Sequence, residues 1–568
     1  MNGVVLASPG AGPTSLSPSA GPSRGAVEDV AEEAALAALL RCCVREVAGP
    51  RGQVWPAGPY LLLRMAGDLI RVPTSGGLAL RFDGPAERLD TGSWSPLSVD
   101  ELVQLVESEL GGTGHNAPNR DSAGEDAPAG ANEEFAGQVT ESRAAISTLL
   151  RARAGTTPPE DPWLASEQSL VYGHPFHPSP KSRGGSGWVR YAPEAHAAFP
   201  TRLLGVRDDL LATGGDPQVL DGLGQAPPGY TLLPAHPWQL ELLGAELAAP
   251  FADGRLVDLG PSALPAVPTS SVRTVYEPQI GKCLKFSIDV RITNCVRKNA
   301  WYELTAAAEL STRLGPVFAD LGRRFPGTRW LREPGYRSAS LGTRLLEGLG
   351  VIVRSSPWEV TGPGVTPVLA GALAAPDGGD VPGALRRDPS RWWGAYVDHV
   401  ALPVLDAYFR HGVVLEPHLQ NVLVGIDAEG MPVEAVFRDL EGTKLVAGRH
   451  DVSGLPGQVA RAATYDATRG WNRVVYCLMV NHLPEIAATI AGAAAPGDGG
   501  VLLRALWADA RERVARYAGE HGHPLPLRDL LAGVPLPAKA NLTARWTRSA
   551  DRDTGYVPVG NPFAGIPT

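Results

Sequence analysis

The sequence has 568 residues, of which 44% are hydrophobic and 20% are charged, and its formal net charge at pH 7 is -9. This length allows roughly three or four domains, and the composition is that of a soluble globular protein. The acidic balance argues against a general nucleic-acid binder and leaves small anionic ligands to local basic pockets.

The cysteine and hydropathy patterns predict a compartment. The cysteines form no CxxC pair and no metal-binding spacing, which favours a reduced, cytoplasmic environment. No basic stretch followed by an apolar one opens the chain, and no window approaches the ~20 uncharged apolar residues of a membrane span. We therefore expect a cytoplasmic protein with no membrane segment and no nucleic-acid partner. The cysteines are Cys42, Cys43, Cys283, Cys295 and Cys477.

The N-terminal part predicts an α/β domain over residues 28–158, preceded by a disordered tail at 1–27 that is rich in Gly, Pro, Ser and Ala. Ser98 followed by Glu101 forms a capping box that begins a helix. The other expected elements are helices at 27–47 and 132–154, strands at 60–65, 68–72 and 78–82, and a loop at 111–131.

A middle domain is expected over residues 159–380. Its segment GHPFHPSPKSRGG at 173–185 contains three prolines, which exclude a helix and predict an extended loop. His174 and His177 have no cysteine or third histidine nearby, so a metal site is the weaker interpretation. Lys181 and Arg183 favour a loop that contacts phosphate, and a purely structural loop remains an alternative.

The most informative stretch of the middle domain is a predicted β-hairpin over residues 268–299. Its strands, at 271–277 and 283–293, are β-branched and alternating, and Pro278 and Gly281 provide the turn. One strand face would carry Lys285, Asp289, Arg291 and Thr293; the opposing strand adds Arg273 and Thr274, and Arg297 and Lys298 follow. Such a face suits phosphate and carboxylate ligands. The alternative is a solvated face paired with Asp289 and Glu277.

Further along, a helix at 300–321 should be kinked or broken at Pro316, and a helix at 391–410 should be interrupted at Pro403. The second helix opens a C-terminal domain at 381–568. It leads into a loop at 411–421, strands at 422–426 and 433–437, and then Asp439. Helices at 472–491, interrupted at Pro484, and at 501–520 complete this domain.

This helix, loop and hairpin have the layout of a protein-kinase catalytic loop and its metal-binding Asp. Glu416, Asn421 and Asp439 would form a carboxylate and amide set suited to Mg²⁺ that bridges phosphates. An ordinary polar hairpin rim is the alternative. The kinase signature itself is not satisfied, because Glu416 stands where the catalytic Asp is expected and no Walker A or Gly-rich loop occurs.

Four segments, in this order, resemble the IucA/IucC family of siderophore synthetases that work without peptide-synthetase machinery. They are GHPFHPSPKSRGG, PTSSVRTVY with KFSIDVRITNCVRKN, HGVVLEPHLQN, and FRDLEG. The resemblance covers roughly residues 160–545 and is looser over the first 150, where the loop at 111–131 looks like an insertion. It implies an α/β (α+β) fold shaped as a cupped hand, with a thumb at 28–158, fingers at 159–380 and a kinase-related palm at 381–568.

The resemblance also implies an activity. A carboxylate, typically of citrate or a citrate or succinyl derivative, attacks the α-phosphorus of Mg·ATP and gives an acyl adenylate and pyrophosphate. An amine or hydroxyl group of the second substrate then displaces AMP. ATP and Mg²⁺ are therefore the expected cofactors, small molecules the expected partners, and a homodimer the expected assembly. Which carboxylate and which acceptor are used stays open, with citrate favoured.

The residues and the resemblance together assign roles. Catalysis is assigned to Lys285, Arg297 and His418. ATP binding is assigned to His174, Lys181, Ser271, Arg273, Thr274, Lys285, Asn294, Arg297 and Asn421. The carboxylate substrate is assigned to Thr293, Arg297, His418, Gln420 and Lys539, and the metal to Glu416, Asn421 and Asp439.

Two other classes of protein remain as alternatives. A small-molecule kinase would release ADP rather than AMP and pyrophosphate. The second is a binding or scaffold protein on a degenerate synthetase fold. Such a protein would have lost charged residues of the hairpin or palm, yet the sequence retains Arg273, Lys285, Arg297 and Asp439.

Overall fold

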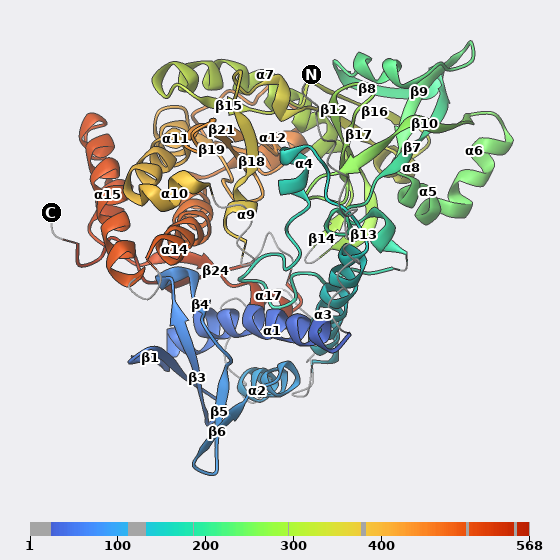
Figure 1. The fold of residues 1–568 in the computed structure, drawn as a ribbon. Coiled ribbons are helices and arrows are strands. Elements are labelled where there is room, and N and C mark those ends of the chain that lie inside the picture. The colour runs from blue at the N-terminus through green and yellow to red at the C-terminus, as the bar shows by residue number, and fades with distance from the viewer. Residues whose placement is uncertain are drawn as a thin grey trace, which may run out of the picture.

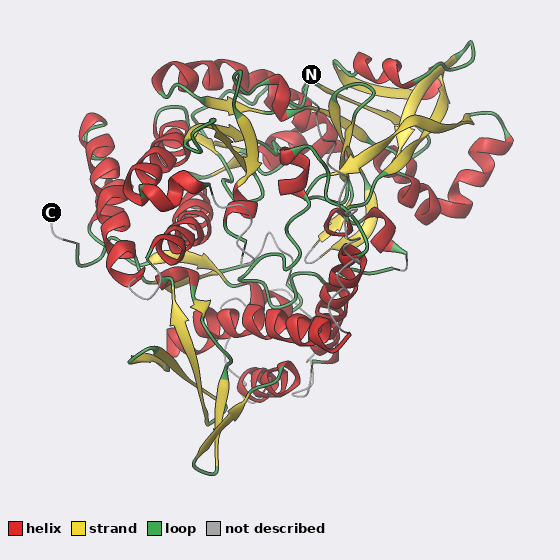
Figure 2. Ribbon diagram, in the orientation of Figure 1, coloured by secondary structure: helices red, strands yellow, loops and turns green. Residues whose placement is uncertain are grey.

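The computed structural model describes residues 24–111, 132–185, 187–292, 295–375, 382–495, 499–549 and 554–566, with the backbone alone at 24, 291–292 and 295–297. Figure 1 shows an N-terminal lobe at the bottom, a large sheet at the upper right, and the C-terminal helices at the upper left. Helices and strands occur in all three parts (Figure 2), so the predicted mixed fold class is confirmed. The cupped-hand description stays a prediction.

The N-terminal lobe packs helices against an antiparallel sheet. Buried Leu39, Leu63, Ile70 and Val106 form part of its core. The predicted capping box is present, because the Ser98 backbone N–H donates to Glu101 Oε2 at 2.9 Å. The elements are α1 (Arg24–Cys42), a π-helix (Cys43–Ala48), β1 (Val54–Ala57), β2 (Tyr60–Met65), β3 (Asp68–Ser75), β4 (Arg81–Phe82), β5 (Glu87–Asp90), β6 (Ser93–Pro96), α2 (Val99–Gly111) and α3 (Glu133–Ala154).

Two expectations for this lobe meet the structure only in part. Helix α1 begins at Arg24, so the last residues of the predicted tail are helical. The predicted loop at 111–131 begins with Gly111, which is the last residue of α2, and residues 1–23 and 112–131 lie outside the described residues. The lobe is fixed to the C-terminal part, because Arg81 donates to Thr489 Oγ1 at 2.7 Å and Glu46 accepts from the Thr543 backbone at 3.0 Å. Arg45 lies 3.2 Å from the ring centre of Phe176.

The middle part is built on an eight-stranded antiparallel sheet in the order β8-β16-β17-β12-β11-β10-β7-β9. The predicted hairpin is present as β11 and β12, with Thr274 opposite Lys285. The strands are β7 (Phe199–Arg207), β8 (Leu211–Gly215), β9 (Tyr230–Ala235), β10 (Leu256–Pro268), β11 (Thr274–Glu277), β12 (Lys282–Phe286), β16 (Gly335–Ala339) and β17 (Val351–Ser355). The helices are α4 (Pro162–Glu167), α5 (Pro237–Leu243), α6 (Ala248–Ala252) and α8 (Thr343–Gly348).

The predicted strand at 283–293 is wrong as a single element. Strand β12 ends at Phe286, and β13 (Ile288–Ile292) pairs instead with β14 (Cys295–Arg297) in a separate sheet. The break falls at Ser287, whose hydroxyl donates to the Glu347 carbonyl at 2.5 Å and accepts from the Asn299 backbone at 2.8 Å. Lys285 and Asp289 therefore do not share one continuous strand face.

The prolines at 316 and 403 do not break their helices. Helix α7 (Trp301–Arg324) runs through Pro316, and α11 (Pro389–Phe409) runs through Pro403. Proline in a helix interior costs about 3 kcal/mol, but α7 buries Leu314 and Phe318 on the two sides of Pro316. Burying two such side chains contributes about 3 to 6 kcal/mol, which offsets the lost hydrogen bond.

The C-terminal part holds the predicted helix, loop and hairpin, here α11, residues 410–421, β20 (Val422–Ile426) and β21 (Pro432–Phe437). These strands form a four-stranded sheet with β15 (Thr328–Trp330) and β18 (Thr366–Leu369). The sheet thus joins strands from both sides of the predicted domain boundary at 380. Helix α7 also packs into the C-terminal core through Leu310 and Leu321.

Most of the remaining helices of the C-terminal part pack on α11 and on one another. Pro484 lies in the first turn of α14, directly after a π-helix that continues α13. The run Ala467–Ala494 is long and apolar enough to cross a membrane, but its apolar window is entirely buried, as in a core helix. The elements are α9 (Ala370–Leu373), α10 (Gly383–Arg387), β19 (Val413–Val414), β22 (Lys444–Val446), α12 (Gly457–Ala463), β23 (Thr464–Tyr465), α13 (Ala467–Val475), the π-helix (Tyr476–His482), α14 (Leu483–Ala494), α15 (Gly499–Glu520), α16 (Leu525–Leu531), β24 (Leu536–Lys539), α17 (Asn541–Trp546) and β25 (Tyr556–Val559).

Candidate active site

A polar pocket lies where the β11–β12 hairpin faces the loop before β20 and the residues after β21. It brings together the hairpin and kinase-like segments that the sequence analysis had treated separately. Of the predicted ATP-binding residues, five line it: Ser271, Arg273, Thr274, Lys285 and Asn421. Its other lining residues are Arg183, Thr269, Ser270, Val272, Arg354, Gln420, Arg438 and Asp439.

Lys285 is the centre of a buried ion-pair cluster at the base of this pocket. Its Nζ lies 2.7 Å from Asp439 Oδ1 and 2.9 Å from Glu441 Oε2, and its side chain is 2% exposed. Arg273 donates to the same Glu441 oxygen at 2.6 Å and to Asn299 Oδ1 at 2.7 Å. Strand β12 therefore delivers its lysine to two carboxylates that follow β21.

Two further arginines enter the pocket without having been singled out in the sequence. Arg354, on β17, donates to Asp439 Oδ1 at 3.1 Å and from its Nε to Glu333 at 2.8 Å. Arg438 donates to Glu167 Oε2 at 3.0 Å and to the Gln420 carbonyl. Both side chains are about as buried as Lys285, so these charges act in a medium that screens them weakly.

The ion pairs fix the ionisation of the carboxylates. Burial by itself would raise the pKa of the Asp439 carboxyl. The charges of Lys285 and Arg354 lower this pKa by more than burial raises it, so it lies well below its usual range. Burial acts in the same way on Glu441, whose pKa is lowered to about 2 by Arg273 and Lys285. Burial and the neighbouring Glu441 raise the pKa of Glu303 to about 7. Asp439 and Glu441 are therefore charged at neutral pH.

The backbone of Asp439 supports a special position for its side chain. Its φ is +73°, in the left-handed region that residues other than glycine seldom adopt. Such strain is typically retained at functional sites.

The predicted metal set is only partly brought together. Asn421 and Asp439 line the pocket, but the Glu416 carboxylate accepts from Arg473 Nε at 2.5 Å and is neutralised there. Asn421 donates to the Glu416 backbone carbonyl at 3.2 Å. The carboxylate that accompanies Asp439 in the cluster is Glu441, which the sequence analysis missed although it belongs to the segment FRDLEG. The structure thus brings Glu441 beside Asp439 through Lys285, while the assignment of the metal to Glu416, Asn421 and Asp439 stays a prediction.

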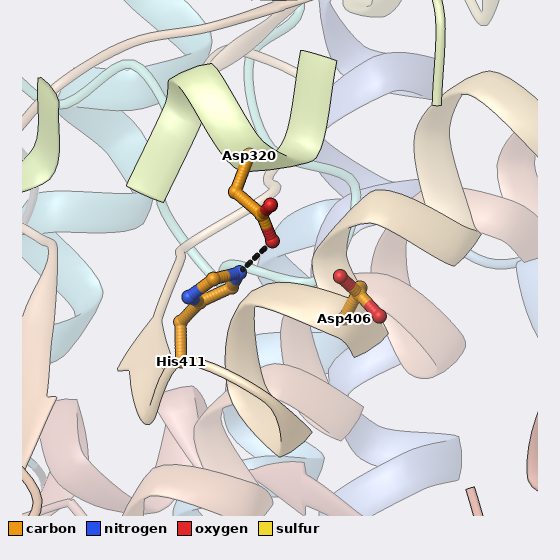
Figure 3. Close-up of side chains that lie close together, drawn as sticks. All are labelled: Asp320, Asp406 and His411. Atoms are coloured by element: carbon orange, nitrogen blue, oxygen red, sulfur yellow. Dashed lines mark hydrogen bonds and ion pairs between the residues drawn. The ribbon is translucent and has the colours of Figure 1, made fainter. Parts of the chain in front are cut away.

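A second acidic group has the spacing of a metal site but not its electrostatics. Figure 3 shows Asp320, Asp406 and His411 directed toward one another. The Asp406 carboxylate already lies 3.2 Å from Arg324 Nε, and Asp320 lies 3.2 Å from Arg410 Nη2. Both carboxylates have guanidinium partners, and none of the three residues is among those that line the polar pocket, so we interpret this group as an ion-pair network apart from the site.

The residues predicted to bind ATP in the loop at 173–185 are bonded within the protein. Lys181, predicted to bind ATP, is buried and bonds to the Leu170 carbonyl and to Glu194, so its ammonium is used inside the protein. His174 Nδ1 accepts from the Phe176 backbone at 3.0 Å. Burial, and next the charge of His418, lower the pKa of His174. His174 therefore lies on the side of His418.

The predicted carboxylate residues fall into two places. His418 Nε2 lies 3.3 Å from Cys477 Sγ, and Lys539, at the end of β24, is buried and acts electrostatically on Cys477 and His174. Gln420 instead lines the polar pocket and donates to the Ser270 carbonyl at 2.9 Å. The other predicted members are not tested: Thr293 and Asn294 lie outside the described residues, and Arg297 is described by its backbone alone, opposite Ile288.

The pocket thus lies between a basic hairpin and a kinase-like loop, and its cationic lining is of the kind that suits phosphate and carboxylate ligands. A model of the IucA/IucC family matches residues 162–375, and one described as ferric iron reductase FhuF-like transporter matches residues 390–555. The rhizobactin siderophore biosynthesis protein RhbC of Rhizobium meliloti (strain 1021) is 30% identical over 74% of this chain and 80% of its own length. The L-2,3-diaminopropanoate–citrate ligase of Staphylococcus aureus (strain NCTC 8325 / PS 47) is 30% identical over 71% and 75%.

Solved structures share the fold. The ATP-bound aerobactin synthetase IucA of Klebsiella pneumoniae superposes with a TM-score of 0.78 at 24% identity, over 94% of this chain and all of the other. The petrobactin biosynthesis protein AsbB of Bacillus anthracis gives 0.75 at 18% identity, over 94% and 96%. The chain belongs to the IucA/IucC family. It is an acid–amine ligase by class, and the kinase alternative is not favoured.

Proposed function

We propose that this chain is an ATP-dependent siderophore synthetase that adenylates a carboxylate of citrate and condenses it with an amine or hydroxyl group. The observation that carries the proposal is a pocket lined by five cationic side chains beside the ionised pair Asp439 and Glu441. The five are Arg183, Arg273, Lys285, Arg354 and Arg438. The relatives named as citrate ligases support citrate as the acid, and their second substrates, diaminopropanoate and spermidine, support a primary amine as the acceptor.

The first half-reaction requires a carboxylate to approach a triphosphate, although the two groups repel each other. Guanidinium and ammonium groups held in a buried site lower this repulsion and align the reacting oxygen with the α-phosphorus. Arg273 and Lys285 are held by the hairpin in position for this task. His418 and Lys539 are not among the residues that line the polar pocket. We assign them to the acid, which His418 would hold by hydrogen bonding rather than attack as a nucleophile.

The residues present fit a magnesium ion. Carboxylate and amide oxygens are its preferred protein ligands. Asp439 and Asn421 supply them in the pocket lining, and Glu441 supplies another beside Lys285. When bound, the ion would neutralise part of the charge of the triphosphate. The contribution of the chain itself is to keep both carboxylates ionised at neutral pH, which the low pKa of Asp439 and Glu441 achieves.

The kinase alternative is weakened by the loop that suggested it. The position of the catalytic base is occupied by Glu416, and its carboxylate is bound to Arg473 at 2.5 Å. That carboxylate oxygen is occupied by a guanidinium of the protein and is not directed at a substrate hydroxyl group. The scaffold alternative is weakened by the retention of Arg273, Lys285 and Asp439 in one ion-pair cluster.

The test is pyrophosphate release from Mg·ATP with hydroxylamine as a general acceptor. The acids compared are citrate, 2-oxoglutarate, succinyl hydroxamates and none. We expect release that depends on citrate, with AMP as the other product. ADP formation, or no turnover with any acid, would contradict the proposal. We further propose that the protein is cytoplasmic and that it forms a homodimer. Sedimentation of the purified protein checks the dimer by its molar mass.

A further inference from the structure

The helical run that follows β23 packs against the loop that carries His418. In α13, Arg473 donates to the Glu416 carboxylate at 2.5 Å. At the end of the π-helix that continues α13, His482 Nδ1 donates at 2.8 Å to the carbonyl oxygen of the residue before His418. Between these two contacts, Cys477 Sγ lies 3.3 Å from His418 Nε2. π-helical turns are uncommon and often occur at functional sites, and this one holds a thiol against the histidine assigned to the acid.

The ring of His418 is held on two sides. The Tyr476 ring packs edge-on against it, with the ring centres 5.9 Å apart and the planes at 81°. The Cys477 thiol, which is fully buried, lies at Nε2. Because the two nitrogens lie on different edges of an imidazole, a thiol at Nε2 directs Nδ1 away from itself. The His418 side chain is half-buried, and Nδ1 is therefore the nitrogen that a bound acid would meet.

The thiol also decides which ring nitrogen carries the proton. Burial raises the pKa of Cys477 to about 12, so the thiol keeps its proton at neutral pH. A thiol sulfur is a weak acceptor, whereas an unprotonated imidazole nitrogen is a good one. The S–H group therefore donates to His418 Nε2, and a neutral imidazole whose Nε2 accepts carries its proton on Nδ1.

We infer that Cys477 is a positioning residue that holds His418 as the Nδ1–H tautomer and so presents a hydrogen-bond donor to the carboxylate of the acid. An ionised carboxylate only accepts hydrogen bonds, so the other tautomer would direct a lone pair at it. Lys539 supplies positive charge nearby, because it acts electrostatically on both Cys477 and His174. The inference rests on the proposed function and deepens it at the acid site.

The tautomer is measured first, without ATP or acid. In protein labelled with ¹⁵N-histidine, a ring nitrogen that carries a proton and one that does not differ widely in chemical shift. The signals of His418 are those that disappear in His418→Gln. At pH 8 we expect Nδ1 protonated and Nε2 unprotonated in the wild type and in Cys477→Ser, whose hydroxyl group can donate in the same place. Cys477→Ala should move both signals toward the tautomer mixture of a free histidine. A wild type with a protonated Nε2, or no change in Cys477→Ala, would overturn the inference.

The kinetics of pyrophosphate release then separate the acid from the nucleotide. Cys477→Ala should raise KM for citrate about threefold to tenfold, as expected for one weakened hydrogen bond, and leave KM for ATP unchanged. Cys477→Ser should restore most of the loss.

The matched control is Cys43→Ala, which removes the same atom from a buried cysteine in the core of the N-terminal lobe. It should leave both KM values unchanged. An equal rise of both KM values in Cys477→Ala, or the same rise in Cys43→Ala, would show a merely structural role and overturn the inference. A wild type that releases no pyrophosphate with citrate would instead overturn the proposed function, whereas the ¹⁵N signals would still test the tautomer.

Discussion

Replacing Lys285 with Met tests whether the pocket is organised around one buried ammonium group. Met keeps most of the side-chain volume but removes the charge that lies 2.7 Å from Asp439 and 2.9 Å from Glu441. Removing one partner of a buried ion pair costs about 3 to 5 kcal/mol. Because Arg273 and Arg354 still contact these carboxylates, we expect the lower end, a loss of about 3 kcal/mol in the free energy of unfolding.

The matched control is Lys282→Met on the same strand. Lys282 pairs with Glu359, but its side chain is 25% exposed, and exposed ion pairs contribute about 0 to 1 kcal/mol. Urea denaturation at pH 7 measures both variants, and pyrophosphate release should be abolished only in Lys285→Met. Equal stability of the two variants would refute the reasoning.

The pH dependence of the same variant provides a second check. The pKa of Glu441 is lowered to about 2 in the folded protein, against about 4.3 for an ordinary Glu. A lowered pKa contributes stability that is present above the unfolded pKa and is lost as pH falls toward the folded pKa. The stability difference between the wild type and Lys285→Met should therefore be constant above about pH 5 and should narrow between about pH 4.3 and pH 2. A difference that stays constant throughout would contradict the ion-pair explanation.

Three other variants or treatments test separate parts of the site. His418→Ala should lower citrate-dependent pyrophosphate release about a hundredfold or more while thermal unfolding stays unchanged, and near-normal turnover would remove His418 from the acid site. Asp439→Asn should raise the Mg²⁺ concentration needed for half-maximal rate about tenfold or more, as a Mg²⁺ titration measures; an unchanged titration would place the metal elsewhere. Burial raises the pKa of Cys477 to about 12, so at pH 8 it should hold roughly a thousandfold less thiolate than an exposed cysteine. Iodoacetamide should then leave it unlabelled in peptide mass spectrometry, and rapid labelling would show that the thiol is accessible.

The parts of the fold that the sequence predicted correctly are those fixed by neighbouring residues. The capping box at Ser98 and the β20–β21 hairpin follow from short-range patterns. The strand at 283–293 did not, because its alternation continues through Ser287 while the backbone there bonds to Gly350 and ends the pairing of β12. Pro316 is a similar case. A proline inside a helix is expected to break it, but α7 runs through Pro316 because the burial of the helix outweighs the cost of the proline.

The predictions for the candidate site divide in the same way, into residues found from local motifs and residues whose role depends on tertiary neighbours. Residues assigned from motifs, such as Arg273 and Asp439, do line the pocket. Glu441 and Arg354 were missed because their importance depends on tertiary neighbours: each is an ordinary charged residue until the fold places it beside Lys285 or Asp439. Lys181 shows the opposite case, since a lysine in a basic loop suggests phosphate binding, yet its position beside Glu194 makes it an internal charge.

The pairing of the pocket's cations with protein carboxylates has a consequence for ligand binding. A buried cation held by Asp439 or Glu441 cannot contact a phosphate at full strength without giving up part of that pairing, because each carboxylate competes for the same N–H donors. A metal ion that binds the carboxylates offsets this competition, so nucleotide and metal should favour each other's binding, and this coupling is reciprocal. Loss of Asp439 should therefore act through Mg²⁺, so Asp439→Asn should weaken nucleotide binding in the presence of the ion more than in its absence.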